Sequence, residues 1–276
     1  MIALTAPSPA EDDAYLTKIC GEPAWMDYFG LWASCYDAYR AHGGNPWSIV
    51  GSKFSEAVGT IQQKLYESRK SVARFKKLRG QQVASCPMCG SSVTGALDHF
   101  LPKEAFPEFS VMAANLVPAC TSCNSSVKGR TYKGESPDEW LIHPYFDTLA
   151  ESDLWQIRII QPYQAARFEA VPSSYHPPSI QKRVAFHLKY VLGEQFQRTC
   201  TNAWATMPQH MRNVAPTAAP VLVTDVHSEL ARLVSYHYVT TGRNAWLSAF
   251  HRGLLGDSLA QAFVAAKATA LTQLAL

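Results

Sequence analysis

The chain has 276 residues, enough for one large domain or two modest ones. Hydrophobic residues make up 47% of it and charged residues 17%, a balance that is typical of globular proteins and excludes a disordered chain. The formal net charge is only +3, so the molecule as a whole is not a strongly basic nucleic-acid binder. Any surface that binds nucleic acid must therefore be local.

The sequence shows no targeting or membrane-spanning segment. Residues 1–13 lack the basic start and the apolar stretch of a signal peptide. The most apolar segments, around 215–223 and 260–276, are short or are interrupted by Lys267 and Gln273. The cysteines are odd in number, and outside two CxxC pairs they are scattered, which disfavours a disulfide framework. We therefore expect a cytoplasmic protein without membrane insertion.

A long basic helix is predicted in the N-terminal region, residues 1–80. Apolar residues recur there at helical spacing: Phe54, Val58, Ile61, Leu65, Val72 and Phe75. A helix over 52–79 accounts for them, since Gly80 follows and a glycine-rich turn precedes. Residues 53–79 hold eight Lys or Arg and two Glu, a balance of 8 − 2 = +6. That charge could hold a polyanion, or it could belong to an ordinary solvated helix face.

The rest of the chain divides into two regions. Residues 81–147 are rich in Cys, Pro, Gly, Ser and Asn and show little helical period, so this region needs a source of stability such as a metal ion. Residues 148–276 begin with a predicted strand at 154–160 and continue with helical spacings. The sequence therefore predicts a mainly helical α+β fold, with a small metal-stapled core between an N-terminal helical region and a C-terminal helical bundle.

Two CxxC pairs, Cys86/Cys89 and Cys120/Cys123, point to a metal site. Each pair can give two thiolates to one tetrahedral ion, and four thiolates without an open position make a structural Zn²⁺ site. Gly90 suits the tight turn that follows the first pair. The alternative is a thioredoxin-like redox motif, but such a motif begins a helix in a βαβ unit, and no such unit is indicated here.

The residues between and after the cysteine pairs carry a second pattern. Asp98 and His99 stand in an apolar run at 96–101, Asn115 precedes another run at 116–119, and Asn124 directly follows the last cysteine. In this order the motif over about 86–130 resembles that of HNH endonucleases of the ββα-metal superfamily. The resemblance implies a β-hairpin followed by a helix. The two apolar runs suit paired strands, and Thr121 or Ser122 could cap the helix.

The same resemblance implies a reaction, the hydrolysis of a phosphodiester. Asp98 and Asn124 would hold one catalytic Mg²⁺ or Mn²⁺ ion through oxygen atoms, and His99 would act as general base. Asn115 would brace the intervening loop and orient the His99 ring. Asn124 departs from the family name, because many members have His there, but its amide also offers an oxygen.

Basic residues around this core are candidate phosphate contacts, although any one of them could be a solvated surface charge: Lys103, Lys128 and Arg130 near the motif, and Lys70, Arg74 and Lys77 on the basic helix. His143 follows the motif and could approach the metal, but a packed structural histidine is the more common case. The remaining histidines show no ligand spacing.

We therefore expect an HNH endonuclease that nicks DNA or cuts both strands. No sequence-reading element such as a helix-turn-helix is evident. The chain is also similar to effector nucleases of bacterial anti-phage systems, Septu-like or Zorya-like, which work beside an ATPase or sensor subunit. The alternative is a non-enzymatic zinc-ribbon module that binds nucleic acid or a partner. That module would need the four cysteines but not Asp98, His99 or Asn124.

Overall fold

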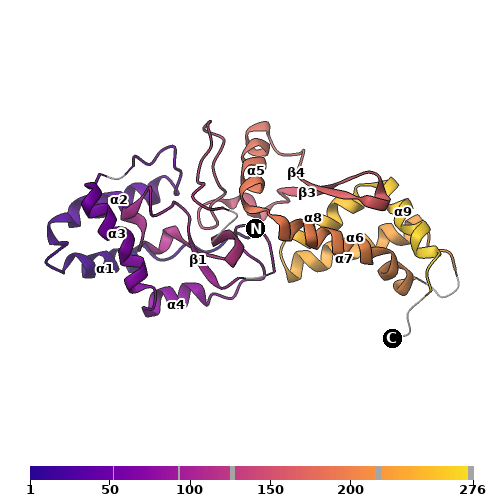
Figure 1. The fold of residues 1–276 in the computed structure, drawn as a ribbon, viewed down its shortest axis with the longest axis horizontal. Coiled ribbons are helices and arrows are strands. Elements are labelled where there is room, and N and C mark those ends of the chain that lie inside the picture. The colour runs from indigo at the N-terminus through magenta and orange to yellow at the C-terminus, as the bar shows by residue number, and fades with distance from the viewer. Residues whose placement is uncertain (52, 93, 125–127, 216–218, 273–276) are drawn as a thin grey trace.

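The computed structural model describes residues 1–51, 53–92, 94–124, 128–215 and 219–272. It shows an elongated α+β molecule in which helices dominate and two small antiparallel sheets lie between them (Figure 1). Helices α1–α4 occupy one end, strand β1 lies near the middle, and helices α6–α9 occupy the other end (Figure 1). The predicted mainly helical α+β class is confirmed. No helix among the described residues is long and apolar enough to cross a bilayer.

The N-terminal helices are α1 (Pro9–Cys20), α2 (Phe29–Ala41), α3 (Glu56–Arg69) and α4 (Ala73–Arg79). The prediction of one helix over 52–79 is therefore wrong, and Ser52 lies outside the described residues. The break between α3 and α4 changes the direction of the chain. In one straight helix Tyr66 and Phe75 would stand about 13 Å apart along the axis, whereas their ring centroids are 5.7 Å apart. Phe75 is fully buried, and this packing favours two shorter helices over the single helix that the apolar spacing predicted.

The middle of the chain forms a short hairpin. Strand β1 (Ala96–His99) pairs antiparallel with β2 (Leu116–Ala119), so that His99 lies opposite Leu116. The two apolar runs were predicted to pair, and this is confirmed. The loop between the strands is packed inward through Phe100, Phe109 and Met112. Residues 121–124 are helical after β2, and 125–127 lie outside the described residues.

The C-terminal region combines a hairpin with a helical bundle. Strand β3 (Trp155–Ile160) pairs antiparallel with β4 (Arg167–Pro172), which confirms the strand expected at 154–160. The helices are α5 (Pro178–Val191), α6 (Glu194–Val214), α7 (Val223–Thr240), α8 (Trp246–Leu255) and α9 (Ser258–Thr269). Helix α8 packs on β3 at Gly253, where an added Cβ would lie 2.1 Å from the carbonyl oxygen of Ile157.

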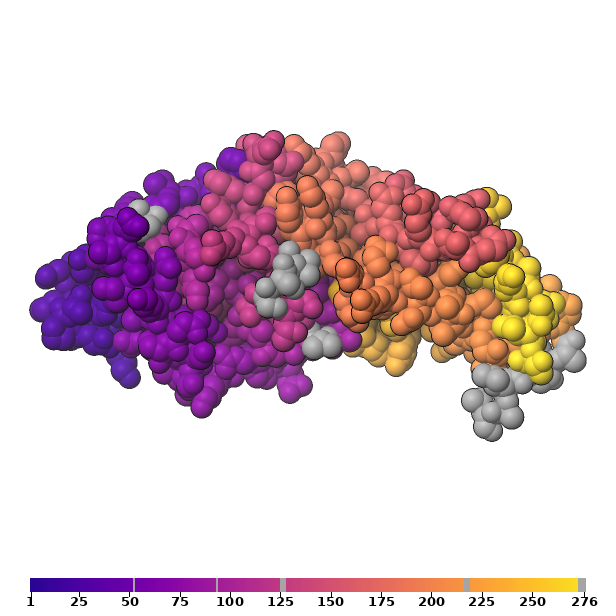
Figure 2. Space-filling view, in the orientation of Figure 1, coloured from indigo at the N-terminus to yellow at the C-terminus, as the bar shows by residue number. Residues whose placement is uncertain are grey.

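Asn244, just before α8, ties the C-terminal bundle to distant segments. Its side chain accepts a hydrogen bond from the Leu154 backbone at 2.9 Å and donates to the carbonyl oxygens of Ala150 and Ser152. Its own carbonyl accepts from the Met1 amino group at 3.0 Å, so the first residue lies at the centre of the molecule (Figure 1). The space-filling view shows one continuous body with the middle of the sequence between the helical ends (Figure 2).

Candidate functional site

Cys86, Cys89, Cys120 and Cys123 meet in the interior of the middle region. All four are buried, and their Sγ atoms lie within 4.8 Å of one another. The Sγ atoms of Cys89 and Cys120 are 3.7 Å apart. Four bonds of about 2.3 Å around a tetrahedral Zn²⁺ ion place neighbouring sulfur atoms about 3.8 Å apart. The cluster could therefore hold a metal ion such as zinc, as the two CxxC pairs predicted.

Backbone groups around the cysteines favour the thiolate form. The Cys120 amide donates to Cys86 Sγ at 3.3 Å, and the Cys123 amide donates to Cys120 Sγ at 3.4 Å. Hydrogen bonds among the four thiols lower the pKa of Cys120, with Cys123 the largest contributor, and raise the pKa of Cys123 in turn. Thiolates are the form that binds metal ions.

The first cysteine pair is fixed against the C-terminal bundle. Trp246 donates through Nε1 to the carbonyl of Cys89 at 2.7 Å, and its backbone amide donates to Gly90 at 3.1 Å. Gly90 has φ +82°, and an added Cβ would lie 2.3 Å from the carbonyl oxygen of Asn244. Only glycine fits both the turn and this close approach. The cysteine cluster is thus built into the body of the protein.

Asp98 and His99 line one cleft of about 650 Å³ at the end of β1. Asn124 lines the same cleft from the helical segment 121–124, which contains the last cysteine, and it is exposed. Strand geometry alone would send adjacent side chains to opposite faces. The strand ends at His99, which allows both residues to contribute to the same cleft. The structure therefore brings together three of the four residues predicted to be catalytic.

The ring of His99 is held by two groups, one from the loop between β1 and β2 and one from α3. Its Nε2 atom lies 2.9 Å from the carbonyl oxygen of Ser110, and the ring of Tyr66 meets it edge-on at a centroid distance of 4.8 Å. Burial lowers the pKa of His99 to about 4, and the ammonium groups of Lys103 and Lys128 act in the same direction. A carbonyl oxygen can only accept, so Nε2 carries the proton and Nδ1 keeps a lone pair.

Asp98 forms a buried ion pair with Lys128. Its Oδ2 atom lies 3.0 Å from the Lys128 ammonium, and only 1% of the Lys128 side chain is exposed. The same ammonium donates to the carbonyl oxygen of His99 at 2.8 Å. Burial raises the pKa of Asp98, and Lys128 opposes that rise. Lys128, a predicted phosphate contact, is thus buried at the cleft and paired with Asp98 rather than solvated at the surface.

Asn115 lies behind the cleft and does not line it. Its side-chain oxygen accepts from the Leu101 amide at 2.8 Å, and its Nδ2 donates to the carbonyl oxygens of Leu101 at 3.0 Å and of Phe109 at 3.2 Å. These bonds connect the two ends of the loop between β1 and β2. The contact that orients His99 comes instead from Ser110, which belongs to that loop.

His143 continues this network away from the cleft. Tyr39 donates to the Asn115 side-chain oxygen at 2.9 Å, and its hydroxyl lies 3.0 Å from Nε2 of His143. The Nδ1 atom of His143 accepts from the Tyr145 amide at 3.1 Å, so Nε2 bears the proton and donates to Tyr39. Burial lowers the pKa of His143 well below its ordinary value. His143 is thus a packed structural residue and does not line the described part of the cleft.

The predicted nucleic-acid contacts separate into two groups. Lys70, Lys103 and Arg130 line the cleft, and Glu67 pairs with Lys70 and Lys103 at 3.0 Å each. Lys77 is exposed on α4, outside the described lining of the cleft. Arg74 is not in the described lining of the cleft, and it instead forms an ion pair with the buried Asp12 and lies over the Tyr15 ring.

Several supporting residues could not be recognised from the sequence. Asp12 in α1 accepts from the amides of Ala113 and Ala114 at 2.8 and 3.2 Å, just before Asn115. Ser110 contacts His99 through its backbone carbonyl, and any residue type offers that group. Tyr66 lies in a predicted helix, and nothing in the sequence indicates that it contacts His99. The basic charge of residues 53–79 offered one clue, since Arg79 at the end of α4 also lines the cleft.

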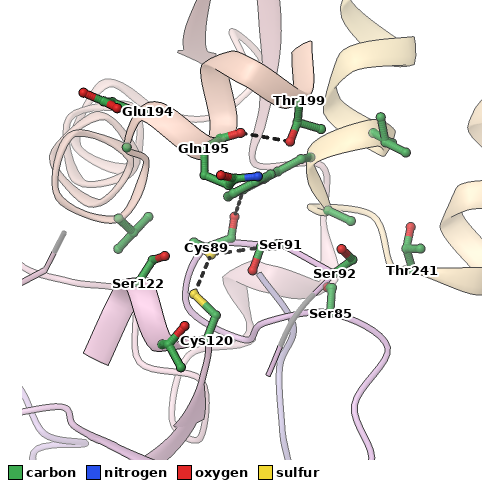
Figure 3. Close-up of a pocket in the computed structure, with 17 residues that line it drawn as sticks. Ser85, Cys89, Ser91, Ser92, Cys120, Ser122, Glu194, Gln195, Thr199 and Thr241 are labelled. Carbon is green, nitrogen blue, oxygen red and sulfur yellow. Dashed lines mark hydrogen bonds between the residues drawn. The ribbon is translucent and has the colours of Figure 1, made fainter. Parts of the chain in front are cut away.

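A second cavity of about 530 Å³ is lined by Cys89 and Cys120 of the cysteine cluster. Figure 3 shows Cys89 and Cys120 on one side of it and Gln195 and Thr199 of α6 on the other. Its described lining includes neither Asp98 nor His99, and Glu194 is its one ionisable side chain apart from the two thiols. This cavity lacks the positive charge that a phosphate would need.

Comparisons with known proteins cover a small part of the chain. A stretch of 63 residues, 22% of this chain, is 48% identical to the protein ea31 of Escherichia phage lambda. That stretch spans only 21% of the phage protein. No protein-family model matches the chain. No solved structure matches it either.

Proposed function

We propose that this protein is a metal-dependent HNH endonuclease that hydrolyses DNA phosphodiester bonds. The observation that carries the proposal is the shared cleft of His99, Asp98 and Asn124, in which Nε2 of His99 bonds Ser110 and leaves Nδ1 with a lone pair. A fixed imidazole beside oxygen ligands for a cation is one combination that can hydrolyse a phosphodiester. The resemblance of the motif to HNH enzymes supports the same assignment.

The donor set suits a hard cation. A carboxylate from Asp98 and an amide from Asn124 line the cleft, and oxygen ligands favour Mg²⁺ or Mn²⁺ over softer ions. When bound, such an ion would neutralise a non-bridging phosphate oxygen and stabilise the leaving alkoxide. The four cysteines would hold a separate zinc ion, whose role is to fold the segment that carries Asn124.

His99 would act as the general base. Its lowered pKa keeps the imidazole neutral at pH 7, so its Nδ1 atom can accept a proton from the attacking water. The Ser110 carbonyl holds the tautomer, and the edge of Tyr66 restricts rotation of the ring. The protonated ring that results would lie beside the negative phosphate, which stabilises it.

The charge of the cleft suits a polyanion. Among the described residues, its lining holds five basic ones (Lys70, Arg79, Lys103, Lys128 and Arg130) and three acidic ones (Glu67, Asp98 and Glu104), a balance of 5 − 3 = +2. That is most of the net charge of the whole chain, concentrated at one site. We further propose, on the resemblance to anti-phage effectors alone, that the nuclease works in bacterial defence beside an ATPase or sensor subunit.

A plasmid assay tests the proposal. Zinc-loaded protein should convert supercoiled DNA to open-circular or linear form with Mg²⁺ or Mn²⁺ and should leave it intact in excess EDTA. Fluorescence anisotropy with a labelled duplex measures binding in the same buffers. Tight binding without cleavage under any divalent cation, unchanged in Asp98→Asn, would instead identify a zinc-ribbon binding module and refute the enzyme.

A further inference from the structure

The Lys128 ammonium contacts both residues of the Asp-His pair. It lies 3.0 Å from Oδ2 of Asp98 and 2.8 Å from the carbonyl oxygen of His99. Both ionic side chains are almost fully buried, at 1% and 7% exposed. Asp98 is the one buried carboxylate in the described lining of the cleft, and it already has a cation as its partner.

A divalent ion that binds Asp98 must therefore accommodate Lys128. It can displace the ammonium from Oδ2, or it can use the other oxygen and stand a few ångströms from a like charge. Both cost free energy where water is largely excluded. The other charged residues of the cleft also disfavour a bound cation, because four of them are basic and two are acidic. They are Lys70, Arg79, Lys103 and Arg130, and Glu67 and Glu104. Without nucleic acid, the cleft is a poor site for a cation.

A phosphodiester reverses this balance. Its oxyanions bring negative charge to the cation and also offer Lys128 a new partner. The Lys128 side chain lines the cleft on a flexible stem, so it can turn from Asp98 towards a phosphate without movement of β1. We propose that Lys128 makes binding of the catalytic cation conditional on bound nucleic acid. This inference rests on the proposed function, and it adds that the metal and the DNA bind cooperatively.

A different role for Lys128 would have the opposite consequence. If the ammonium only fixed Asp98 in the orientation that the ion needs, its removal would weaken cation binding, with or without DNA. If Lys128 competes with the ion, its removal strengthens binding to the DNA-free protein. The sign of the change therefore separates the two roles.

The experiment measures Mn²⁺ binding by electron paramagnetic resonance on zinc-loaded full-length protein. The His99→Ala background prevents cleavage of the probe, a short DNA duplex. In this background we compare the parent, which retains Lys128, with the Lys128→Gln and Lys128→Met variants. Gln keeps a hydrogen-bond donor for Asp98, and Met does not. Asp98→Asn in the same background gives the Mn²⁺ that DNA binds by itself. Arg130→Gln removes an equal charge from the exposed edge of the cleft. Zinc content and circular dichroism establish that each variant is folded.

We expect DNA to tighten Mn²⁺ binding at least tenfold when Lys128 is present. Lys128→Gln should bind Mn²⁺ at least tenfold more tightly than its parent without DNA, whereas Arg130→Gln should change that affinity less than threefold. Equal Mn²⁺ affinity with and without DNA, or weaker binding by folded Lys128→Gln, would overturn the inference. If the wild-type protein still cleaves plasmid DNA, the proposed function survives that result. Absence of both cleavage and Mn²⁺ binding would refute both.

Discussion

The imidazole Nε2 atom of His99 lies 2.9 Å from the backbone carbonyl oxygen of Ser110. Ser110 is held in turn, because its hydroxyl donates to the carbonyl of Gln62 in α3 at 2.6 Å. A helix from the N-terminal region thus fixes the loop that fixes the proposed general base. The orientation of the ring therefore depends in part on α3, which lies outside the motif.

Tyr66 provides the second restraint on His99, and its removal should loosen the ring. We expect Tyr66→Ala to lower the rate of plasmid cleavage about tenfold, since small misplacements of a catalytic group are costly. Tyr66→Phe keeps the edge contact and should retain more than half of the rate. The two initial rates at saturating DNA check this. Equal loss in both variants would show that the hydroxyl, rather than the ring contact, matters.

Substitution of Asn115 should mainly affect stability, whereas substitution of Asn124 should mainly affect cleavage. Asn115→Ala removes the bonds to Leu101 and Phe109 in the interior, and we expect it to lower the free energy of unfolding by about 3 kcal/mol. Asn124 is exposed, so Asn124→Ala should change stability by less than about 0.5 kcal/mol while it lowers cleavage. Urea unfolding and the plasmid assay on both variants provide the comparison. A destabilised Asn124→Ala with normal cleavage would contradict these roles.

Loss of one cysteine ligand should release the zinc ion and unfold the middle region. We expect Cys120→Ser to lose bound zinc and to melt far below the parent, because a structural zinc ion contributes on the order of 10 kcal/mol to small units. Cys200 is also buried but lies outside the cluster, so Cys200→Ser should retain zinc with a modest loss of stability. Metal analysis and thermal denaturation measure both effects. Retention of a full equivalent of zinc by Cys120→Ser would refute the four-ligand site.

His251 should make the protein less stable in mild acid. It is 5% exposed and stacks on His237 at 5.0 Å, and burial lowers its pKa to about 4. The unfolded chain therefore binds a proton near its ordinary pKa of 6.5, whereas the folded protein does not. The contribution to stability is complete above pH 6.5 and is lost as the pH falls from there towards 4. Between about pH 7.5 and 5.5 we expect a loss of about 1 kcal/mol from this residue. Urea unfolding of His251→Leu should show a correspondingly shallower pH dependence, and an identical slope would contradict the assignment.

The elements with local signals could be predicted from sequence. The paired CxxC motifs placed the cysteine cluster, and the apolar runs gave β1, β2 and β3. The features that could not be predicted depend on contacts between residues far apart in the sequence. The break between α3 and α4 allows Phe75 to be buried in the core. Arg74 pairs with the buried Asp12, which lies 62 positions away in the sequence. Lys128 resembled a surface charge because nothing in its neighbourhood reveals that Asp98 lies beside it. Spacing identifies residues that share one element, whereas tertiary contacts decide their partners.

The measurement that tests the central claim most directly is the single-turnover rate of plasmid cleavage by His99→Ala beside the wild-type protein, both zinc-loaded and folded, in Mg²⁺. If His99 is the general base, the variant should cleave at least a hundredfold more slowly while it binds DNA with unchanged affinity. A variant that cleaves at the wild-type rate would show that the imidazole of His99 does not carry the reaction.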